Sequence, residues 1–310
     1  MNDRLPTSSL LEKPILEGKH PAIQLLCMVM LVFGCGIIIS IVGMLIAYGF
    51  WGEGVENPTA GYYRFLQVVN AIGVFLVPAL LFSYLQHKHW FSYSGADRKP
   101  GRAVTMVCVG AAALCILPTA GVLVELTKSI PWPGVMAGME EWMHEKQAAS
   151  DRILELMTAD THISTLIINL LACAIVPAVC EEFFFRGSLQ QLLHSWCKNA
   201  HVAVWVTGFI FSAIHLQIDG FVARWLLGAY LGYLLVWSGS IWLPILAHFL
   251  HNALSIIIQH IFLSHGNLPE STLTPATIVS SIIAMLFLIL FIYLIYRTSH
   301  KKSTITTSSI

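Results

Sequence analysis

Eight long apolar segments limit most strongly what this chain can fold into. They lie at residues 22–50, 65–86, 103–127, 163–185, 201–218, 222–238, 241–263 and 275–296. A helix that crosses the hydrocarbon core of a bilayer needs about 20 predominantly apolar residues, and most of these segments reach or approach that length. We therefore predict an all-α protein, a polytopic membrane bundle of about eight transmembrane helices in which tight turns join the shorter helices.

The composition supports this prediction and excludes other classes of protein. Charged residues make up 11% of the chain, whereas soluble proteins contain about 25%. The 17 Lys and Arg balance 17 Asp and Glu, and no basic stretch stands out, which excludes nucleic acid as a partner. The seven cysteines form no C-x-x-C pair, and six of them (Cys27, Cys35, Cys108, Cys115, Cys173 and Cys180) lie inside apolar segments, which indicates small membrane-buried residues rather than a disulfide framework. Membrane lipid is the surrounding partner that this composition implies.

The distribution of Lys and Arg predicts the orientation. If the N-terminus is cytoplasmic, five of the 17 fall on outer segments and the rest on inner ones; the five are Arg64, Lys128, Lys146, Arg152 and Arg224. Cytoplasmic segments carry an excess of these residues. We expect a multi-pass protein of the cell (inner) membrane with both termini in the cytoplasm.

One connection, residues 128–162, is long. Apolar and charged residues recur there at about helical spacing, which is typical of a helix in the membrane interface. An amphipathic spacer and a lid over a site both agree with this pattern, and Asp151 is a candidate cap for its second part. We divide the chain into residues 1–162, with three spans and this segment, and residues 163–310, a core of five spans.

Three charges stand together inside the fourth apolar segment, in the sequence Glu181-Glu182-Phe-Phe-Phe-Arg186. Each charge at the centre of a membrane helix costs about 2.5–3.5 kcal/mol. Glu182 and Arg186 are i,i+4 neighbours and can pair, whereas Glu181 points about 100° away. A carboxylate without a partner in an apolar environment is a candidate general base. The alternative is a buried ion-pair network that only holds two helices together.

Two further polar motifs lie on the following helices. Phe211 precedes His215 by four residues, and His248 precedes Asn252 by four, which places each pair on one helix face. Glu181 lies 17 residues before Lys198 and His215 lies 17 after it. With a break near residues 197–200, both lie about 25 Å from the turn. A packed core histidine explains His215 or His248 alone, but the three motifs together indicate a site.

This set of side chains can add water to an acyl carbon. Glu181 would take a proton from water, His215 would hold that water, and His248 and Asn252 would donate hydrogen bonds to the oxyanion. A zinc ion held by Glu181, His215 and His248, with one position open, is the alternative. The chain contains no H-E-x-x-H helix of the soluble metalloproteases.

The motifs E-E-x-x-x-R, F-x-x-x-H and H-x-x-x-N, in this order on apolar helices, resemble those of the CPBP intramembrane proteases. That family comprises type II CAAX prenyl endopeptidases and bacterial bacteriocin-processing or self-immunity proteins, and the resemblance covers residues 163–262. It implies an intramembrane endopeptidase that cleaves membrane-protein or leader-peptide substrates. The residues that it implies are listed by role: Glu181, His215, His248 and Asn252 as catalytic, and Glu182, Arg186 and Phe211 as supporting.

The resemblance leaves several alternatives open. The family was labelled metalloprotease, yet a glutamate-dependent mechanism without a firmly held metal is also associated with it, so zinc is the one candidate cofactor. The competing function is a non-proteolytic transporter, immunity protein or scaffold with a structural polar cluster. The charge count also places the motifs nearer the outer face, whereas prenyl proteases are expected to act from the cytosol. An inverted topology, a deep cavity reached from inside, or external substrates would each reconcile the two.

Overall fold

The computed structural model describes residues 14–52, 58–130, 134–265 and 273–300. These residues are helical apart from short connections and contain no strand. Seven of their helices are long and apolar enough to cross a membrane, which confirms the prediction of an all-α polytopic bundle. Four cations of the charge count lie outside the described residues: Arg4, Lys13, Lys301 and Lys302.

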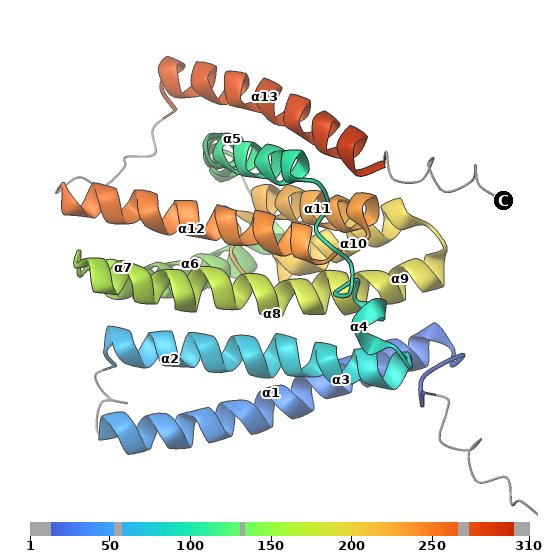
Figure 1. Ribbon diagram of the computed structural model, residues 1–310. Coiled ribbons are helices and arrows are strands. Elements are labelled where there is room, and N and C mark those ends of the chain that lie inside the picture. Colours follow the sequence, from blue (N-terminus) through green and yellow to red (C-terminus); the bar gives the residue numbers. More distant parts are fainter. Residues whose placement is uncertain (1–13, 53–57, 131–133, 266–272, 301–310) are drawn as a thin grey trace, which may run out of the picture.

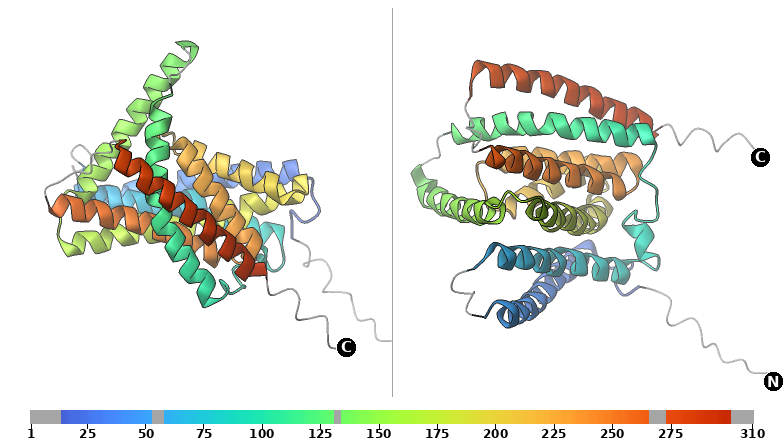
Figure 2. Two further views of the ribbon diagram at one scale, coloured as in Figure 1. Left: turned by 90° about the horizontal axis from the view of Figure 1, so that it is seen from above. Right: turned by 60° about the vertical axis from the view of Figure 1, so that its left-hand side comes forward.

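The helices are stacked in layers (Figure 1), and the view from above shows α5 and α13 crossing the layers beneath them obliquely (Figure 2). The described segments next to the N- and C-termini lie at the same end of the bundle, which we call the terminal side (Figures 1 and 2). In chain order the helices are α1 (Pro21–Trp51), α2 (Ala60–Asn70), α3 (Val77–Gln86), α4 (Trp90–Tyr93), α5 (Ala103–Lys128), α6 (Ala137–Thr158), α7 (Ile163–Asn169), α8 (Val176–Phe184), α9 (Gln190–Cys197), α10 (Ala200–Ala213), α11 (Phe221–Ser238), α12 (Trp242–Ser264) and α13 (Pro275–His300).

Two of the spans are continuous helices that contain π-helical segments. Residues Ala71–Leu76 join α2 to α3 in this way. Residues Leu170–Ile175 join α7 to α8, and Phe185–Leu189 join α8 to α9. The helix therefore runs without a break over the 35 residues Ile163–Cys197, beyond the predicted end at residue 185. This extension places the motif of the two glutamates near the middle of the span.

The next two helices, α10 and α11, form a hairpin in which α10 is shorter than a membrane span. The predicted break near residues 197–200 is confirmed, because Lys198 adopts a left-handed conformation and Asn199 caps the start of α10. The predicted span 201–218 is wrong in its end, since α10 stops at Ala213 after 14 residues. That length is about 21 Å, against about 30 Å for the hydrocarbon core. We therefore expect the connection at residues 214–220 to lie at membrane depth.

The long connection between the third and fourth spans contains the helix α6, whose first half stands away from the bundle (Figure 2). Its end is tied down: Arg64 of α2 donates hydrogen bonds to the carbonyl of Met157 and to Asn169, and Gln259 of α12 donates to Thr158. The prediction that Asp151 caps a second helix is wrong. One helix runs through that position, where Asp151 accepts a hydrogen bond from Gln147 within it.

A connection of four residues, 159–162, leads from α6 into α7. Asp160 accepts hydrogen bonds from the Thr165 hydroxyl at 2.6 Å and from the backbone N–H of His162 at 3.0 Å. These hydrogen bonds favour the ionised carboxylate, so they hold the pKa of Asp160 below its usual value. The turn therefore fixes where the fourth span begins.

Glycines bring α10 and α11 into close contact. A Cβ atom on Gly208 would lie 2.9 Å from the backbone nitrogen of Ala229, and one on Gly228 would lie 2.8 Å from Cα of Gly208. Small residues at such crossings let helix backbones approach closely in membranes. The close approach holds together the hairpin that ends at membrane depth.

Replacing Gly208 by alanine should therefore destabilise the protein, because the methyl group meets backbone atoms that can only move apart with the helix. We expect a loss of about 1–3 kcal/mol, typical of overpacking, measured as a lower Tm in detergent. Gly110→Ala in α5 is the matched control, since a Cβ there meets nothing within 4 Å. Equal Tm values for the two variants would contradict the close contact.

Candidate active site

The four residues predicted to be catalytic line one cavity of about 410 Å³. Glu181 comes from α8, His215 from the connection between α10 and α11, and His248 and Asn252 from α12. Phe211, predicted as a supporting residue, lines the same cavity. The structure thus brings together side chains that lie up to 71 positions apart in the sequence, between residues 181 and 252.

Glu182 lies behind the cavity, fully buried, and connects two of its walls. Its Oε1 atom accepts a hydrogen bond from Nη1 of Arg186 at 2.7 Å and one from Nδ1 of His248 at 2.8 Å. Arg186 is also fully buried, and its Nη2 donates to the carbonyl of Gly228 at 2.9 Å. The i,i+4 pair expected from the sequence is present, and it also fixes α12 against α8.

The bond to Glu182 determines what His248 can do in the cavity. An ionised carboxylate only accepts hydrogen bonds, so Nδ1 of His248 carries the hydrogen. The Nε2 atom of the neutral ring is then an acceptor, and it becomes a donor only when the ring is protonated. The predicted donation from His248 to an oxyanion therefore requires the imidazolium form beside Glu182.

His215 is oriented in a similar way by the backbone. Its Nδ1 lies 2.7 Å from the carbonyl oxygen of Phe211, and a carbonyl only accepts, so this nitrogen also carries the hydrogen. The chain turns directly after it, because Leu216 adopts a left-handed φ of 53°. Ser212 donates to the carbonyl of Phe221 at 2.7 Å and closes the turn. His215 is therefore held on a non-helical connection at membrane depth.

The aromatic ring of Phe211 contacts three of the polar side chains. The guanidinium carbon of Arg186 lies 4.8 Å from the ring centroid. The rings of His215 and His248 lie 5.1 and 5.8 Å away in edge-on orientations. A cation over an aromatic face is stabilised by the ring quadrupole. Phe211 thus separates the buried ion pair from the cavity and positions both imidazoles.

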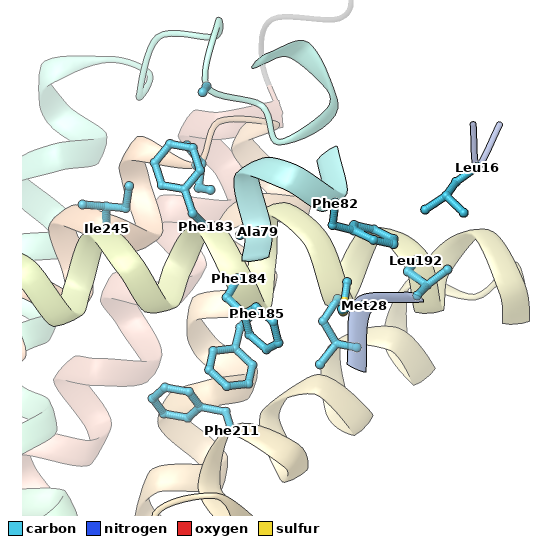
Figure 3. Packing of buried hydrophobic residues seen from close by; sticks show 13 residues of the cluster. Leu16, Met28, Ala79, Phe82, Phe183, Phe184, Phe185, Leu192, Phe211 and Ile245 are labelled. Carbon is cyan, nitrogen blue, oxygen red and sulfur yellow. The ribbon is translucent and has the colours of Figure 1, made fainter. Parts of the chain in front are cut away.

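The three phenylalanines between the glutamates and Arg186 belong to the apolar core (Figure 3). Phe185 packs edge-on against Phe211 with centroids 5.1 Å apart. Phe184 and Phe185 both contact Phe75 of the second span, and Phe183 contacts Trp242 at the start of α12. These contacts fix the rotation of α8 and thereby determine that Glu181 faces the cavity.

Glu181 and Asn252 are among the groups whose side chains the surrounding protein leaves open to the cavity. Within the described part of the chain, neither side chain forms a hydrogen bond or an ion pair. Glu181 is nevertheless buried, with 8% of its surface exposed, and it lines the cavity together with Asn252. A buried carboxylate and a free amide in one cavity are the groups needed to activate water and to stabilise a developing negative charge.

Sequence reasoning did not assign two further residues to the cavity. Arg224 was assigned to an outer segment in the charge count, but it lies in the first turn of α11 and lines the cavity. His251, which precedes Asn252, also lines the cavity. The sequence does not indicate that Arg224 belongs to the cavity. Its place there follows from the early end of α10 at Ala213, which brings the start of α11 to the cavity.

The residues present do not fit the predicted zinc site. Among the described residues, no three His, Cys, Asp or Glu side chains lie close enough together to hold a metal ion. The guanidinium of Arg224 lines the same cavity and would repel a divalent cation. The ligand set Glu181, His215 and His248 is therefore not assembled around a common point, although each side chain by itself is a suitable donor.

The cavity also receives side chains from the first half of the chain. They come from α2, α5 and α6, and Leu154 of α6 is among them. An adjoining cavity of about 270 Å³ shares Ile116, Ala120, Ala223 and Leu227 with it and is lined mainly by apolar and aromatic residues of α5, α11 and α13. Apolar space thus lies directly beside the polar groups.

Comparisons with known proteins agree with the motifs. Residues 163–254 match the family described as type II CAAX prenyl endopeptidase Rce1-like, which confirms for this segment the resemblance to the CPBP proteases. The chain is also similar to the protein YpbD of Bacillus subtilis (strain 168), itself described as uncharacterized. The two are 28% identical over 92 residues, which cover 27% of this chain and 42% of that protein. No solved structure matches the chain at a significant level.

Removing the charge of Arg186 should destabilise the protein strongly. Arg186→Met leaves Glu182 as a buried charge held only by His248, and breaking a buried ion pair costs about 3–5 kcal/mol. We expect a large fall in Tm, which Glu182→Gln in the same chain partly restores because it removes the uncompensated charge. Lys128→Met is the control, since its exposed pair with Glu125 contributes about 0–1 kcal/mol. A Tm for Arg186→Met equal to that of the control would contradict this role.

Proposed function

We propose that this protein is an intramembrane endopeptidase in which Glu181 is the general base that activates water. The observation that carries the proposal is that the unpaired carboxylate of Glu181 shares one cavity with His215, His248 and Asn252. The family match over residues 163–254 supports the class of reaction, since it includes all three motifs. The similar protein YpbD is described as uncharacterized and therefore gives no information about the substrate.

The first step, the attack of water on the peptide bond, uses Glu181 and His215. A water molecule between Glu181 and Nε2 of His215 gives a proton to the carboxylate, while its oxygen attacks the carbonyl carbon of the peptide bond. The new C–O bond converts the carbonyl into a tetrahedral oxyanion. General base catalysis of this kind contributes about 10²–10⁴-fold to the rate.

The second step breaks the C–N bond. Asn252 and the protonated ring of His248 donate hydrogen bonds to the oxyanion, and Glu182 stabilises that imidazolium through Nδ1. The intermediate collapses to a carboxylic acid as protonated Glu181 returns its proton to the leaving nitrogen. Glu182, Arg186 and Phe211 are positioning residues in this scheme. No step is assigned to zinc, and a chelator tests whether the protein needs it.

The substrate is proposed to be a membrane-associated protein or leader peptide. Its peptide bond must reach membrane depth, where the connection after α10 lies, and the adjoining apolar cavity is suited to hydrophobic groups of such a chain. The helix α6, which contributes Leu154 to the cavity, is proposed to lie in the membrane interface at the side opposite to the termini.

The test is cleavage of a quenched fluorogenic peptide library by protein purified in detergent. Glu181→Gln should lower the rate by about 10²–10⁴-fold, and His215→Ala should also lower it, while both variants keep the wild-type Tm. Glu17→Gln, at an exposed carboxylate on the terminal side, is the matched control and should cleave like wild type. A zinc chelator should leave the rate unchanged.

Each contrary outcome corrects a different part of the proposal. Loss of cleavage on chelation, with recovery on adding zinc, would replace the glutamate mechanism by a metal mechanism. Wild-type rates in Glu181→Gln would remove Glu181 from the reaction. If no peptide is cleaved, yet Glu181→Gln still supports the protein's function in cells, the transporter or scaffold alternative replaces the protease.

The proposed orientation, with both termini in the cytoplasm, can be measured at Cys197. This cysteine is exposed at the last residue of α9, next to the turn before α10 on the terminal side, whereas the other six are buried or half-buried. An impermeant thiol reagent should label inverted membrane vesicles and not intact cells, and Cys197→Ser should abolish the labelling. Labelling of intact cells would show that the topology is inverted and that the site opens towards the cytosol.

A further inference from the structure

The site contains a second arginine, the half-buried Arg224, which the protein pairs less completely than Arg186. Its Nη2 donates to the neutral amide oxygen of Gln217 at 2.6 Å. Its Nη1 is shut off from solvent and has no hydrogen-bond partner. No carboxylate of the described residues forms an ion pair with it, in contrast to Arg186, which is bonded to Glu182.

This contrast indicates a purpose beyond packing. A cation at membrane depth is costly unless it is paired or hydrogen-bonded. Arg186 meets both conditions and belongs to the framework, whereas Arg224 lines the cavity beside Glu181 and His215, attracts the Glu181 carboxylate without forming an ion pair with it, and keeps one nitrogen without a hydrogen-bond partner. An acceptor that arrives with the substrate would supply the missing partner.

The chemistry of the missing partner follows from the guanidinium group. Its planar fork of donors matches a carboxylate, which it binds by two parallel charge-assisted hydrogen bonds. The backbone near Arg224 also favours a negatively charged ligand. Gly220 and Ala223 at the start of α11 also line the cavity, and no side chain caps this helix end, so its N–H groups add positive potential.

We propose that Arg224 binds a carboxylate of the substrate beside the bond that is cleaved. The carboxylate is either the free C-terminus of the substrate or an acidic side chain close to the bond. This inference rests on the proposed endopeptidase function and names the specificity of the same cavity. It also explains how an anionic substrate group is accommodated in a cavity that already contains the carboxylate of Glu181.

A binding measurement tests this inference without cleavage. The probes are an acetylated tripeptide of alanine, leucine and phenylalanine with a free C-terminal carboxylate, the same tripeptide as its amide, and an amidated version with glutamate in place of leucine. Glu181→Gln protein in detergent should bind the better carboxylate probe about 10- to 100-fold more tightly than the neutral amide. The probe that binds more tightly identifies the source of the carboxylate.

Replacing the guanidinium should remove this discrimination. In Glu181→Gln/Arg224→Gln protein the ratio between the carboxylate and amide probes should fall towards 1, and in Glu181→Gln/Arg224→Lys it should be intermediate because the charge remains without the fork. Glu181→Gln/Arg98→Gln is the control, since Arg98 is exposed on the terminal side, and should keep the full ratio. Tm values show that each variant is folded.

The outcomes separate this inference from the proposed function. Equal binding of all three probes to Glu181→Gln protein, or a ratio that survives Arg224→Gln, overturns the role of Arg224 even if wild type is an active protease. Discrimination that depends on Arg224 upholds the role even if the wild-type protein cleaves no peptide, in which case only the protease proposal fails.

Discussion

One carboxylate oxygen, Oε1 of Glu182, connects most of the second half of this protein. It accepts hydrogen bonds from Arg186 on its own helix and from His248 on α12. Arg186 in turn binds a carbonyl of α11 and stacks on Phe211 of α10. In an apolar environment these bonds have no competition from water, and losing one leaves a charge exposed to a low dielectric. The relative placement of four helices, and with it the cavity, therefore depends on this ion pair.

One of the proposed catalytic residues, His215, lies where regular structure ends. Irregular backbone is tolerated at membrane depth only where it is buried in protein or lines a cavity that holds water. The connection that carries His215 satisfies this condition, because it is closed by its own hydrogen bonds and faces the cavity. Water needed for hydrolysis is thus compatible with the site, even though the surrounding helices are apolar.

Much of the fold and part of the site could be predicted from the sequence. Apolar length predicts the helices, and equal distances from the turn at Lys198 place Glu181 and His215 at one depth, because helix rise is constant. The rotation of each helix about its own axis cannot be predicted in this way. The bond between Glu182 and His248 depends on how α8 and α12 face each other, which the packing of distant phenylalanines determines. Arg224 was missed because nothing local announces that α10 ends at Ala213, and an arginine at the edge of an apolar segment resembles an ordinary loop charge.

The shortness of α10 has a consequence for how the protein is made. A segment of 14 residues is too short to be inserted as an independent span, so we expect α10 and α11 to enter the bilayer together as one hairpin. The site then cannot exist until α12 has left the ribosome and supplied His248 and Asn252. During synthesis the nascent chain therefore carries an unassembled set of polar residues, and the cavity is complete only after α12 has been inserted.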